Sequence, residues 1–313
     1  MATRKDMPRR FREMLQSGET FVQPGAFNAQ SALIAEAAGF KTIVVSGYGL
    51  SATLLGKPDV GLMTLTEVVQ MTGYICDAVN IPVLGDGDTG HGNAINVMRT
   101  AEQLIKAGVG GFFIEDQVAP KRCGHVAGKQ VIPISEAVGK YRAAVKVRDE
   151  MNPDVVLVAR SDARGVAGGS IEEVITRCKA YRDAGVDVVF PEGVISREEV
   201  EQVSRAVDVP LFYNRTGVSP NMQLSDMRDL RIFLVINANG AHRAGARAMW
   251  DYLHAFAQED AALDMRLAEQ IKQHPLADFH AFVGFPQIRM LEEEFLPADD
   301  VARKYEGSLG FRP

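Results

Sequence analysis

The chain has 313 residues, of which 46% are hydrophobic and 24% charged, so wholesale disorder is excluded and an ordinary buried core is expected. Its formal net charge of -6 argues against nucleic acid as a partner, because nucleic-acid binders usually carry a basic surface. No apolar run approaches the roughly 18 residues of a membrane helix, and the charged N-terminus lacks the apolar segment of a signal peptide. The three cysteines are far apart and lack Cys-x-x-Cys spacing, which is typical of a reducing compartment without a zinc site. We therefore expect a cytoplasmic location.

Short apolar segments recur along the chain at intervals of roughly 30 residues, the length of one βα unit. Eight such segments begin at Phe21, Thr42, Val83, Gly111, Val155, Val186, Leu211 and Arg231. They are nearly all apolar, as parallel strands covered on both faces usually are. Helical patterns between them end at a Gly or close to one, as in 29–40, 94–108 and 170–185. The pattern predicts an α/β fold of the (β/α)8 TIM-barrel type, with a doubly wound open sheet as the alternative.

The pattern changes after Asp260, where two further helical segments follow outside the eight βα units. These are ALDMRLAEQIKQH and FPQIRMLEEEFLP, and no Ser- or Pro-rich linker precedes them. We therefore predict a single barrel domain over residues 1–313, with C-terminal helices from about residue 260.

Polar or charged residues follow six of the apolar segments directly. They are Ser46-Gly47-Tyr48, Asp86-Gly87-Asp88, Glu115-Asp116, Arg160-Ser161-Asp162, Glu192 and Asn214-Arg215. The carboxyl ends of the strands form the active site in a (β/α)8 barrel. The six positions therefore predict one shared site.

Asp86 and Asp88 are two residues apart, so both side chains point to one side if the strand geometry continues. Two converging carboxylates repel each other unless a cation lies between them, and hard oxygen ligands suit Mg²⁺ or Mn²⁺. Asp59, Glu115 and Asp116 would add a second layer of acidic groups. The alternative is that the aspartates belong to the turn before the next helix.

Arg160 ends an otherwise apolar segment, where a guanidinium can hold a substrate carboxylate by two hydrogen bonds. Ser46 and the backbone of Gly47 and Tyr48 would hold the other carboxylate oxygens. The alternatives are an ordinary turn at 46–48 and a salt bridge from Arg160 to Asp162, Glu192 or Glu115.

Cys123 lies in the polar, glycine-containing segment PKRCGHVAGKQ, with Lys121, Arg122 and His125 around it. A thiol in an exposed basic loop is a candidate reactive group, and the alternative is an inert loop residue. We expect His125 to form hydrogen bonds rather than to bind a metal.

Several of these motifs occur in an order that resembles the isocitrate lyase/phosphoenolpyruvate mutase superfamily. They are SGYGLSATLLGKPDVGLMT, DGDTGHGN, IEDQVAPKRCGH, ARSDA and FPEG, and they span roughly residues 24–192. The KRCGH loop is the most specific of them. The chain is most similar to the short-chain lyase branch, which includes 2-methylisocitrate lyase, 2,3-dimethylmalate lyase, oxaloacetate hydrolase and the petal death protein.

The resemblance implies a barrel whose eighth helix is exchanged between subunits, giving a homodimer or homotetramer. It implies Mg²⁺ (or Mn²⁺) at Asp86, with metal-bound waters at Asp59, Asp88 and Glu115. It implies that Cys123 is the catalytic acid and that Arg160 and Tyr48 bind the 2-oxo acid. We expect Arg160 and Tyr48 to take part in catalysis as well, with Tyr48 as a candidate for the base that takes the 2-hydroxyl proton. The substrate-binding set comprises Ser46, Gly47, Tyr48, Lys121, Gly124, His125, Arg160, Glu192 and Asn214.

The implied activity is Mg-dependent cleavage of the C2–C3 bond of a small 2-hydroxy di- or tricarboxylate. A substrate of the 2-methylisocitrate or 2,3-dimethylmalate type would give a 2-oxo acid such as pyruvate and a second carboxylic acid. The alternative is an oxaloacetate hydrolase, which forms oxalate and acetate, or a related 2-oxo acid C–C hydrolase or decarboxylase. A barrel without catalytic activity is disfavoured by the acidic groups together with Cys123.

Two segments depart from the pattern of the branch. Residues 214–220 read NRTGVSP, shorter than the usual stretch and with Arg215 where an acid is expected. Residues 237–241 read NANGA in place of the usual Pro-Leu-Thr/Ser-Ala. Both segments are expected to border the pocket for the leaving fragment, so the identity of the substrate stays open at this point.

Overall fold

The computed structural model of the protein describes residues 6–124, 126–259, 261–307 and 309–310. The chain divides into two compact units, one up to Gly245 and one from Ala246 onward. The division falls inside the helix α9 (Gly240–Glu259). The single domain over residues 1–313 stays a prediction.

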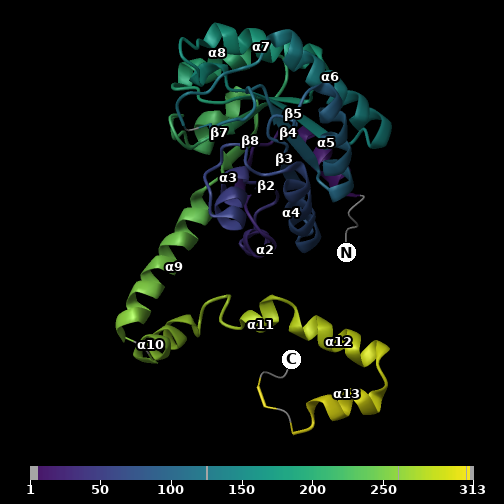
Figure 1. The fold of residues 1–313 in the computed structure, drawn as a ribbon, viewed down its shortest axis with the longest axis vertical. Coiled ribbons are helices and arrows are strands. Elements are labelled where there is room, and N and C mark those ends of the chain that lie inside the picture. Colours follow the sequence, from purple (N-terminus) through teal and green to yellow (C-terminus); the bar gives the residue numbers. More distant parts are fainter. Residues whose placement is uncertain (1–5, 125, 260, 308, 311–313) are drawn as a thin grey trace. The chain divides into compact units, whose positions relative to one another are not determined.

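Eight parallel strands close into a barrel in chain order, as Figure 1 shows. The strands are β1 (Phe21–Ala26), β2 (Ile43–Val45), β3 (Val83–Asp86), β4 (Gly111–Glu115), β5 (Val156–Ser161), β6 (Val188–Pro191), β7 (Leu211–Asn214) and β8 (Ile232–Asn237). Each lies within one of the eight apolar segments of the sequence. The predicted (β/α)8 barrel is therefore confirmed, and β8 pairs with β1 instead of leaving an open edge.

The first helix precedes β1, and the others follow β1 to β6 along the chain and cover the outside of the barrel (Figure 1). These helices are α1 (Met7–Gln16), α2 (Ala29–Ala37), α3 (Gly47–Leu50), α4 (Leu65–Ala78), α5 (Ala94–Ala107), α6 (Ile134–Met151), α7 (Ile171–Asp183) and α8 (Arg197–Ala206). The three helices expected from the sequence correspond to α2, α5 and α7. Gly108 ends α5 in the left-handed conformation, with φ of 94°, which Gly adopts without steric cost.

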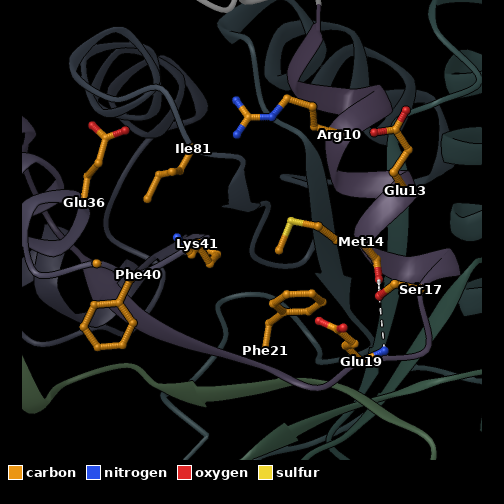
Figure 2. A pocket seen from close by; sticks show the side chains of 11 residues that line it. Arg10, Glu13, Met14, Ser17, Glu19, Phe21, Glu36, Phe40, Lys41 and Ile81 are labelled. Carbon is orange, nitrogen blue, oxygen red and sulfur yellow. Dashed lines mark hydrogen bonds between the residues drawn. The ribbon is translucent and has the colours of Figure 1, made fainter.

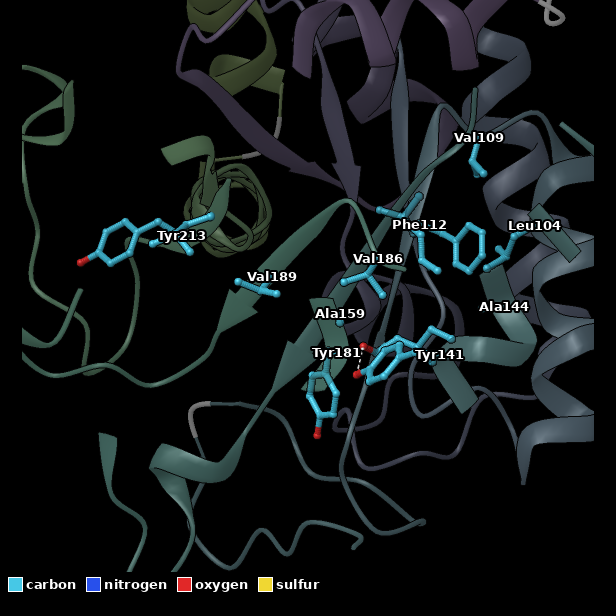
Figure 3. Packing of buried hydrophobic residues seen from close by; sticks show 14 of the residues in the cluster. Leu104, Val109, Phe112, Tyr141, Ala144, Ala159, Tyr181, Val186, Val189 and Tyr213 are labelled. Atoms are coloured by element: carbon cyan, nitrogen blue, oxygen red, sulfur yellow. Dashed lines mark hydrogen bonds between the residues drawn. The ribbon is translucent and has the colours of Figure 1, made fainter. Parts of the chain in front are cut away.

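Side chains of each strand alternate between two apolar layers. The outer layer lies between strands and helices, where Phe112 packs near Leu104 of α5 and Ala159 near Tyr141 and Tyr181 (Figure 3). The inner layer fills the barrel and includes Val44, Leu84, Phe113, Val158, Phe190 and Phe212. Because the side-chain period of a strand is two, the next inward residue lies two positions further along the chain.

Polar residues occupy that next inward position on six strands. They are Ser46, Asp86, Glu115, Arg160, Glu192 and Asn214. The polar layer therefore lies directly above the apolar filling, at the carboxyl ends of the strands. Helix α1 closes the opposite end, because its fully buried Phe11 packs against Phe233 with ring centroids 5.4 Å apart.

The unit that follows Ala246 contains the rest of α9 and four more helices: α10 (Ala261–Ile271), α11 (Phe279–Phe282), α12 (Phe285–Phe295) and α13 (Ala298–Tyr305). Helix α12 falls within the second helical segment expected there, and α10 matches the first but begins one residue earlier. Large apolar side chains stay exposed on this unit, among them Trp250, Met265, Met290 and Phe295. Among the described residues, the chain forms no helix with the length and hydropathy needed to span a membrane.

Candidate active site

A cavity at the carboxyl ends of the strands brings most of the predicted site residues together. It is lined by Ser46, Gly47, Tyr48, Asp59, Asp86, Lys121, Cys123, Gly124, Arg160, Glu192 and Asn214, with Val45, Phe113, Phe190, Ile236, Ala238 and Asn239. Asp88 lines an adjoining hollow that also touches Asp59 and Asp86. Glu115 is buried beside Arg160. His125 lies outside the described residues.

A wider hollow lies at the other end of the barrel, beside α1 (Figure 2). Met14, Phe21 and Ile81 line it, with Arg10 and Glu13 near its edge. Among its described lining residues there is no cysteine, histidine or buried carboxylate. Of these two hollows, the one at the carboxyl ends of the strands is therefore the candidate active site.

Asp86 is the last residue of β3, and backbone groups from two elements hold its carboxylate. The Gly47 amide donates to Oδ2 over 3.2 Å, and the Asp88 amide donates to Oδ1 over 3.0 Å. A Cβ on Gly47 would lie 2.6 Å from Oδ2, so only Gly allows this approach. Asp88 has φ of 46°, so a left-handed turn, and not a continued strand, brings the two aspartates together.

Lys121 lies between two of these carboxylates. Its Nζ is 2.7 Å from Oδ1 of Asp59 and 2.7 Å from Oδ1 of Asp88. Lys121 is 5% exposed, which differs from the exposed basic loop that the sequence predicts around Cys123. The half-buried Cys123 is held nearby, because its backbone amide donates to the Asp59 carbonyl over 3.1 Å.

Burial of this cluster moves the pKa of several groups. Burial, followed by the charge of Asp88, raises the pKa of Asp86 to about 7. Burial also raises the pKa of Glu115 well above its usual value, although Arg160 opposes the shift. Burial works against the charge of Lys121, but the carboxylates of Asp88, Glu115 and Asp59 together hold its pKa well above the usual range. The cluster therefore carries more carboxyl groups than its cations neutralise.

That excess of carboxylates fits a hard divalent cation. Oε1 of Glu115 is buried and has no hydrogen-bond partner among the described residues. No three carboxylate, imidazole or thiol groups in the described part of the chain are placed to enclose a metal ion. Mg²⁺ usually keeps several waters and binds through one or two carboxylates, so an open site at Asp86 matches its chemistry.

Arg160 faces the cavity while holding several partners. Its Nε and one terminal nitrogen donate to the two oxygens of Asp162, both over 2.9 Å, and its other terminal nitrogen lies 3.2 Å from Oε2 of Glu115. The guanidinium also lies over the Phe190 ring, 5.3 Å from its centroid. Two of the predicted salt bridges are therefore present, and they fix the plane of a cation that borders the cavity.

The remaining polar residues hold one another around the cavity. Asn214 donates through Nδ2 to both oxygens of Glu192, over 3.0 and 3.3 Å. The Ser46 hydroxyl donates to Oδ1 of Asn239 over 3.3 Å and accepts from the Gly49 amide. Asn239 belongs to the 237–241 segment, which therefore borders the same cavity as Ser46.

Asp116, expected among the second layer of acidic groups, lies outside the barrel and not in the site. Its carboxylate accepts hydrogen bonds from Ser161, the Asp162 amide, Arg177 and Tyr181. The expectation is wrong for a simple reason: neighbouring residues of a strand face opposite sides, so Glu115 faces inward and Asp116 outward.

Two functional candidates were not assigned to the site from the sequence. The sequence places Asp162 among the polar strand ends and makes it a salt-bridge partner of Arg160, but assigns it no binding or catalytic role, and it gives Lys129 no role in the site. Lys129 Nζ donates to the Gly124 carbonyl over 2.6 Å and lies 3.1 Å from Oδ1 of Asp162. Its signal was its place in the polar segment shared with Cys123, six residues further along the chain.

A family model described as phosphoenolpyruvate phosphomutase matches residues 11–257, most of the chain. The chain belongs to the phosphoenolpyruvate mutase/isocitrate lyase superfamily. Among curated members of this superfamily, it is 35% identical to 2,3-dimethylmalate lyase of Eubacterium barkeri over 288 residues, covering 91% of this chain and 97% of that protein. It is 37% identical to 2-methylisocitrate lyase of Aeropyrum pernix over 300 residues, covering 95% and 92%.

Solved structures agree with this membership of the superfamily. A crystal structure of 2,3-dimethylmalate lyase superimposes with a TM-score of 0.85 at 30% identity, covering 99% of this chain and all of that chain. A structure of oxaloacetate acetylhydrolase with 3,3-difluorooxalacetate gives 0.83 at 29%, covering 93% and 97%. Phosphonopyruvate hydrolase, solved with oxalate and Mg²⁺, gives 0.80 at 28%, covering 93% and 99%. The chain is thus an enzyme of this superfamily. Lyases predominate among its relatives, and it is a C–C lyase.

Proposed function

We propose that this enzyme cleaves the C2–C3 bond of a 2-hydroxy di- or tricarboxylate of the 2-methylisocitrate or 2,3-dimethylmalate type. The products are a 2-oxo acid such as pyruvate and a second carboxylic acid. The observation that carries the proposal is the presence of Cys123, Arg160 and Asp86 on one cavity. The two curated lyases described above, each covered over more than nine-tenths of its length, support the choice of substrate class.

In this proposal, Arg160 and the Ser46–Gly47 turn hold the carboxylate end of the substrate. Asp86 would bind Mg²⁺ (or Mn²⁺), with Asp59, Asp88 and Glu115 holding its waters. When bound, the cation supplies Lewis-acid stabilisation of negative charge on the substrate oxygen. The phosphonopyruvate hydrolase structure solved with Mg²⁺ supports the choice of metal.

Cys123 is the proposed acid for the other fragment. Cleavage of the C2–C3 bond leaves the bonding electron pair on C3, and this carbanion takes the thiol proton. Glu192 and Asn214 border the same space and would orient the leaving fragment. Tyr48, which also lines the cavity, is the candidate for the group that accepts the 2-hydroxyl proton.

The second candidate function is hydrolysis of oxaloacetate to oxalate and acetate. The observation that favours it is the likeness to oxaloacetate acetylhydrolase over 93% of the chain.

A substrate panel separates the two functions. The purified protein is incubated with Mg²⁺ and 2-methylisocitrate, 2,3-dimethylmalate, isocitrate or oxaloacetate, and pyruvate, glyoxylate and oxalate are quantified. The proposal predicts pyruvate from one of the first two substrates, with a kcat/KM above that for oxaloacetate. Turnover of oxaloacetate alone would replace it with the hydrolase.

We also propose a homodimer or homotetramer, formed by exchange of C-terminal helices between subunits, in the cytoplasm. The exposed apolar side chains of the unit after Ala246 support the assembly, because such groups usually mark a contact surface.

A further inference from the structure

Lys129 is a buried lysine beside the active-site cavity that the mechanism above leaves without a role. It is 5% exposed, and its ammonium has two acceptors: the Gly124 carbonyl at 2.6 Å and Oδ1 of Asp162 at 3.1 Å. Gly124 follows Cys123 directly in the chain. Lys129 therefore fixes the backbone next to the proposed acid.

Asp162 connects this lysine to the cation that faces the cavity. Its Oδ1 accepts from both Lys129 Nζ and a terminal nitrogen of Arg160, and its Oδ2 accepts from Nε of Arg160. The Asp162 side chain is fully buried, and its backbone amide donates to Asp116 over 2.9 Å. One rigidly held carboxylate is thus shared by two cations, one on the cysteine loop and one on β5.

Two glycines make room for this arrangement. A Cβ on Gly124 would lie 2.6 Å from a terminal nitrogen of Arg160, so the loop backbone packs directly on the guanidinium. A Cβ on Gly165, in the turn after β5, would lie 2.5 Å from Lys129 Nζ. The position of the ammonium therefore depends on the absence of a side chain at Gly165, and the contact of the loop with Arg160 depends on its absence at Gly124.

We infer that Lys129 is a positioning residue, which holds the Cys123 loop against Arg160 through Asp162. The inference rests on the proposed function, because it requires Cys123 to act on a substrate held by Arg160. Without the ammonium, the Gly124 carbonyl loses a charge-assisted hydrogen bond and the thiol loses its fixed distance from the substrate. The two contacts that give Lys129 this role are those with the Gly124 carbonyl and with Asp162.

The first test is Lys129→Met, which keeps an unbranched side chain only one atom shorter and removes both interactions. Alkylation of Cys123 by iodoacetamide, followed by peptide mass spectrometry, should become roughly tenfold faster in the free enzyme, since the loop is less firmly held. Oxalate with Mg²⁺ should protect Cys123 in the wild type and protect it less in the variant. The kcat should fall about 10- to 100-fold with KM within about threefold, because the acid is displaced while the carboxylate clamp remains.

The second variant, Gly165→Ala, displaces the ammonium and leaves its charge in place. It should change Cys123 alkylation and kcat in the same direction as Lys129→Met, and it decides the matter if Lys129→Met does not fold. Gly139→Ala is the matched control, since a Cβ there on α6 meets nothing within 4 Å. Lys140→Met is the control for loss of a buried lysine, because its Nζ donates to the Thr89 carbonyl and not to Gly124 or Asp162. Neither control should accelerate Cys123 alkylation.

The outcomes separate the inference from the proposed function. The positioning role alone would be overturned by one result: oxalate protects Cys123 equally in the wild type, Lys129→Met and Gly165→Ala, and the kcat of both variants stays within about twofold of the wild type. Failure of oxalate and Mg²⁺ to protect Cys123 in the wild type would overturn the proposed function and this inference with it.

Discussion

The Nζ atom of Lys121 lies 2.7 Å from Oδ1 of Asp88, and both side chains are almost entirely shielded from solvent. The same ammonium lies 2.7 Å from Asp59, 62 residues earlier in the chain. A single lysine of the cysteine loop therefore neutralises two acidic groups beside the proposed cation site. Its removal leaves buried carboxylates without a counter-charge.

We predict that Lys121→Met lowers the free energy of unfolding in EDTA by about 3–5 kcal/mol, the cost of breaking a buried ion pair. Mg²⁺ should raise the melting temperature of the variant more than that of the wild type, because the cation replaces part of the lost positive charge. Urea unfolding and thermal denaturation, each with and without Mg²⁺, measure both effects. Lys146→Met, which removes an exposed pair with Glu150, is the control and should change little. Equal melting temperatures for wild type and Lys121→Met would contradict the role of this contact.

Metal removal tests the carboxylate cluster. Excess chelator should abolish turnover, and Mg²⁺ or Mn²⁺ should restore it, because the cluster around Asp86 brings together more carboxyl groups than Lys121 and Arg160 neutralise. Asp86→Asn should stay inactive at every Mg²⁺ concentration tested, since the direct carboxylate is lost. Calorimetric titration with Mn²⁺ provides a readout independent of turnover. Full activity in excess chelator is the result that the account does not allow.

The two remaining cysteines should respond differently from Cys123 to alkylation and to pH. Cys178 on α7 is fully buried, and burial, followed by the charge of Asp116, raises the pKa of its thiol. We expect Cys178 to resist iodoacetamide in the native protein between pH 7 and 9, while Cys123 reacts. Cys76 is also buried and should react more slowly than Cys123. Peptide mass spectrometry at several times measures each rate.

The same thiol predicts a loss of stability at alkaline pH. The pKa of Cys178 is higher in the folded state than in the unfolded chain, where it is about 8.5. The contribution of the Cys178 thiol to the free energy of unfolding is therefore fully present below about pH 8.5. It falls as the pH rises, by up to ~1.4 kcal/mol per pH unit. Between pH 8.5 and 9.5, the free energy of unfolding should fall less in Cys178→Ala than in the wild type, because the variant lacks the thiol. Urea denaturation at the two pH values measures this change. An equal change in the free energy of unfolding of the two proteins would exclude the effect.

The apolar side chains exposed after Ala246 lead to a prediction about assembly. Light scattering at micromolar concentration should give the mass of a dimer or tetramer. Trp250→Glu, which places a charge on an apolar and 71% exposed position of α9, should shift the mass toward the monomer. A wild-type protein that remains monomeric over this concentration range would contradict helix exchange.

The barrel and the polar strand ends could be predicted from the sequence because both follow from local periodicity, whereas Cys123 and Lys121 came from the composition of their loop and from the family resemblance. The eight apolar segments recur at the length of a βα unit, and a polar residue two positions beyond an inward apolar residue must also face inward. Val158 and Arg160 on β5 illustrate the rule, as do Leu84 and Asp86 on β3.

The rest of the site depends on contacts and backbone conformations that no local pattern encodes. The contact of Lys121 with Asp59 joins residues that are distant in the sequence. The left-handed conformation of Asp88 places its carboxylate where an extended strand would not. The contact of Lys129 with Asp162 joins residues 33 positions apart in the sequence, so no local pattern indicates it.

The central claim is that Cys123 gives a proton to the fragment that leaves after C2–C3 cleavage. Steady-state kinetics of Cys123→Ser on the substrate identified in the panel tests it most directly. Serine keeps the shape but is a far weaker acid, so kcat should fall about 10²- to 10⁴-fold. The KM should change little, because Arg160 and the Asp86 end of the cavity hold the substrate. A kcat close to that of the wild type would contradict the claim and favour a hydrolase that uses water alone.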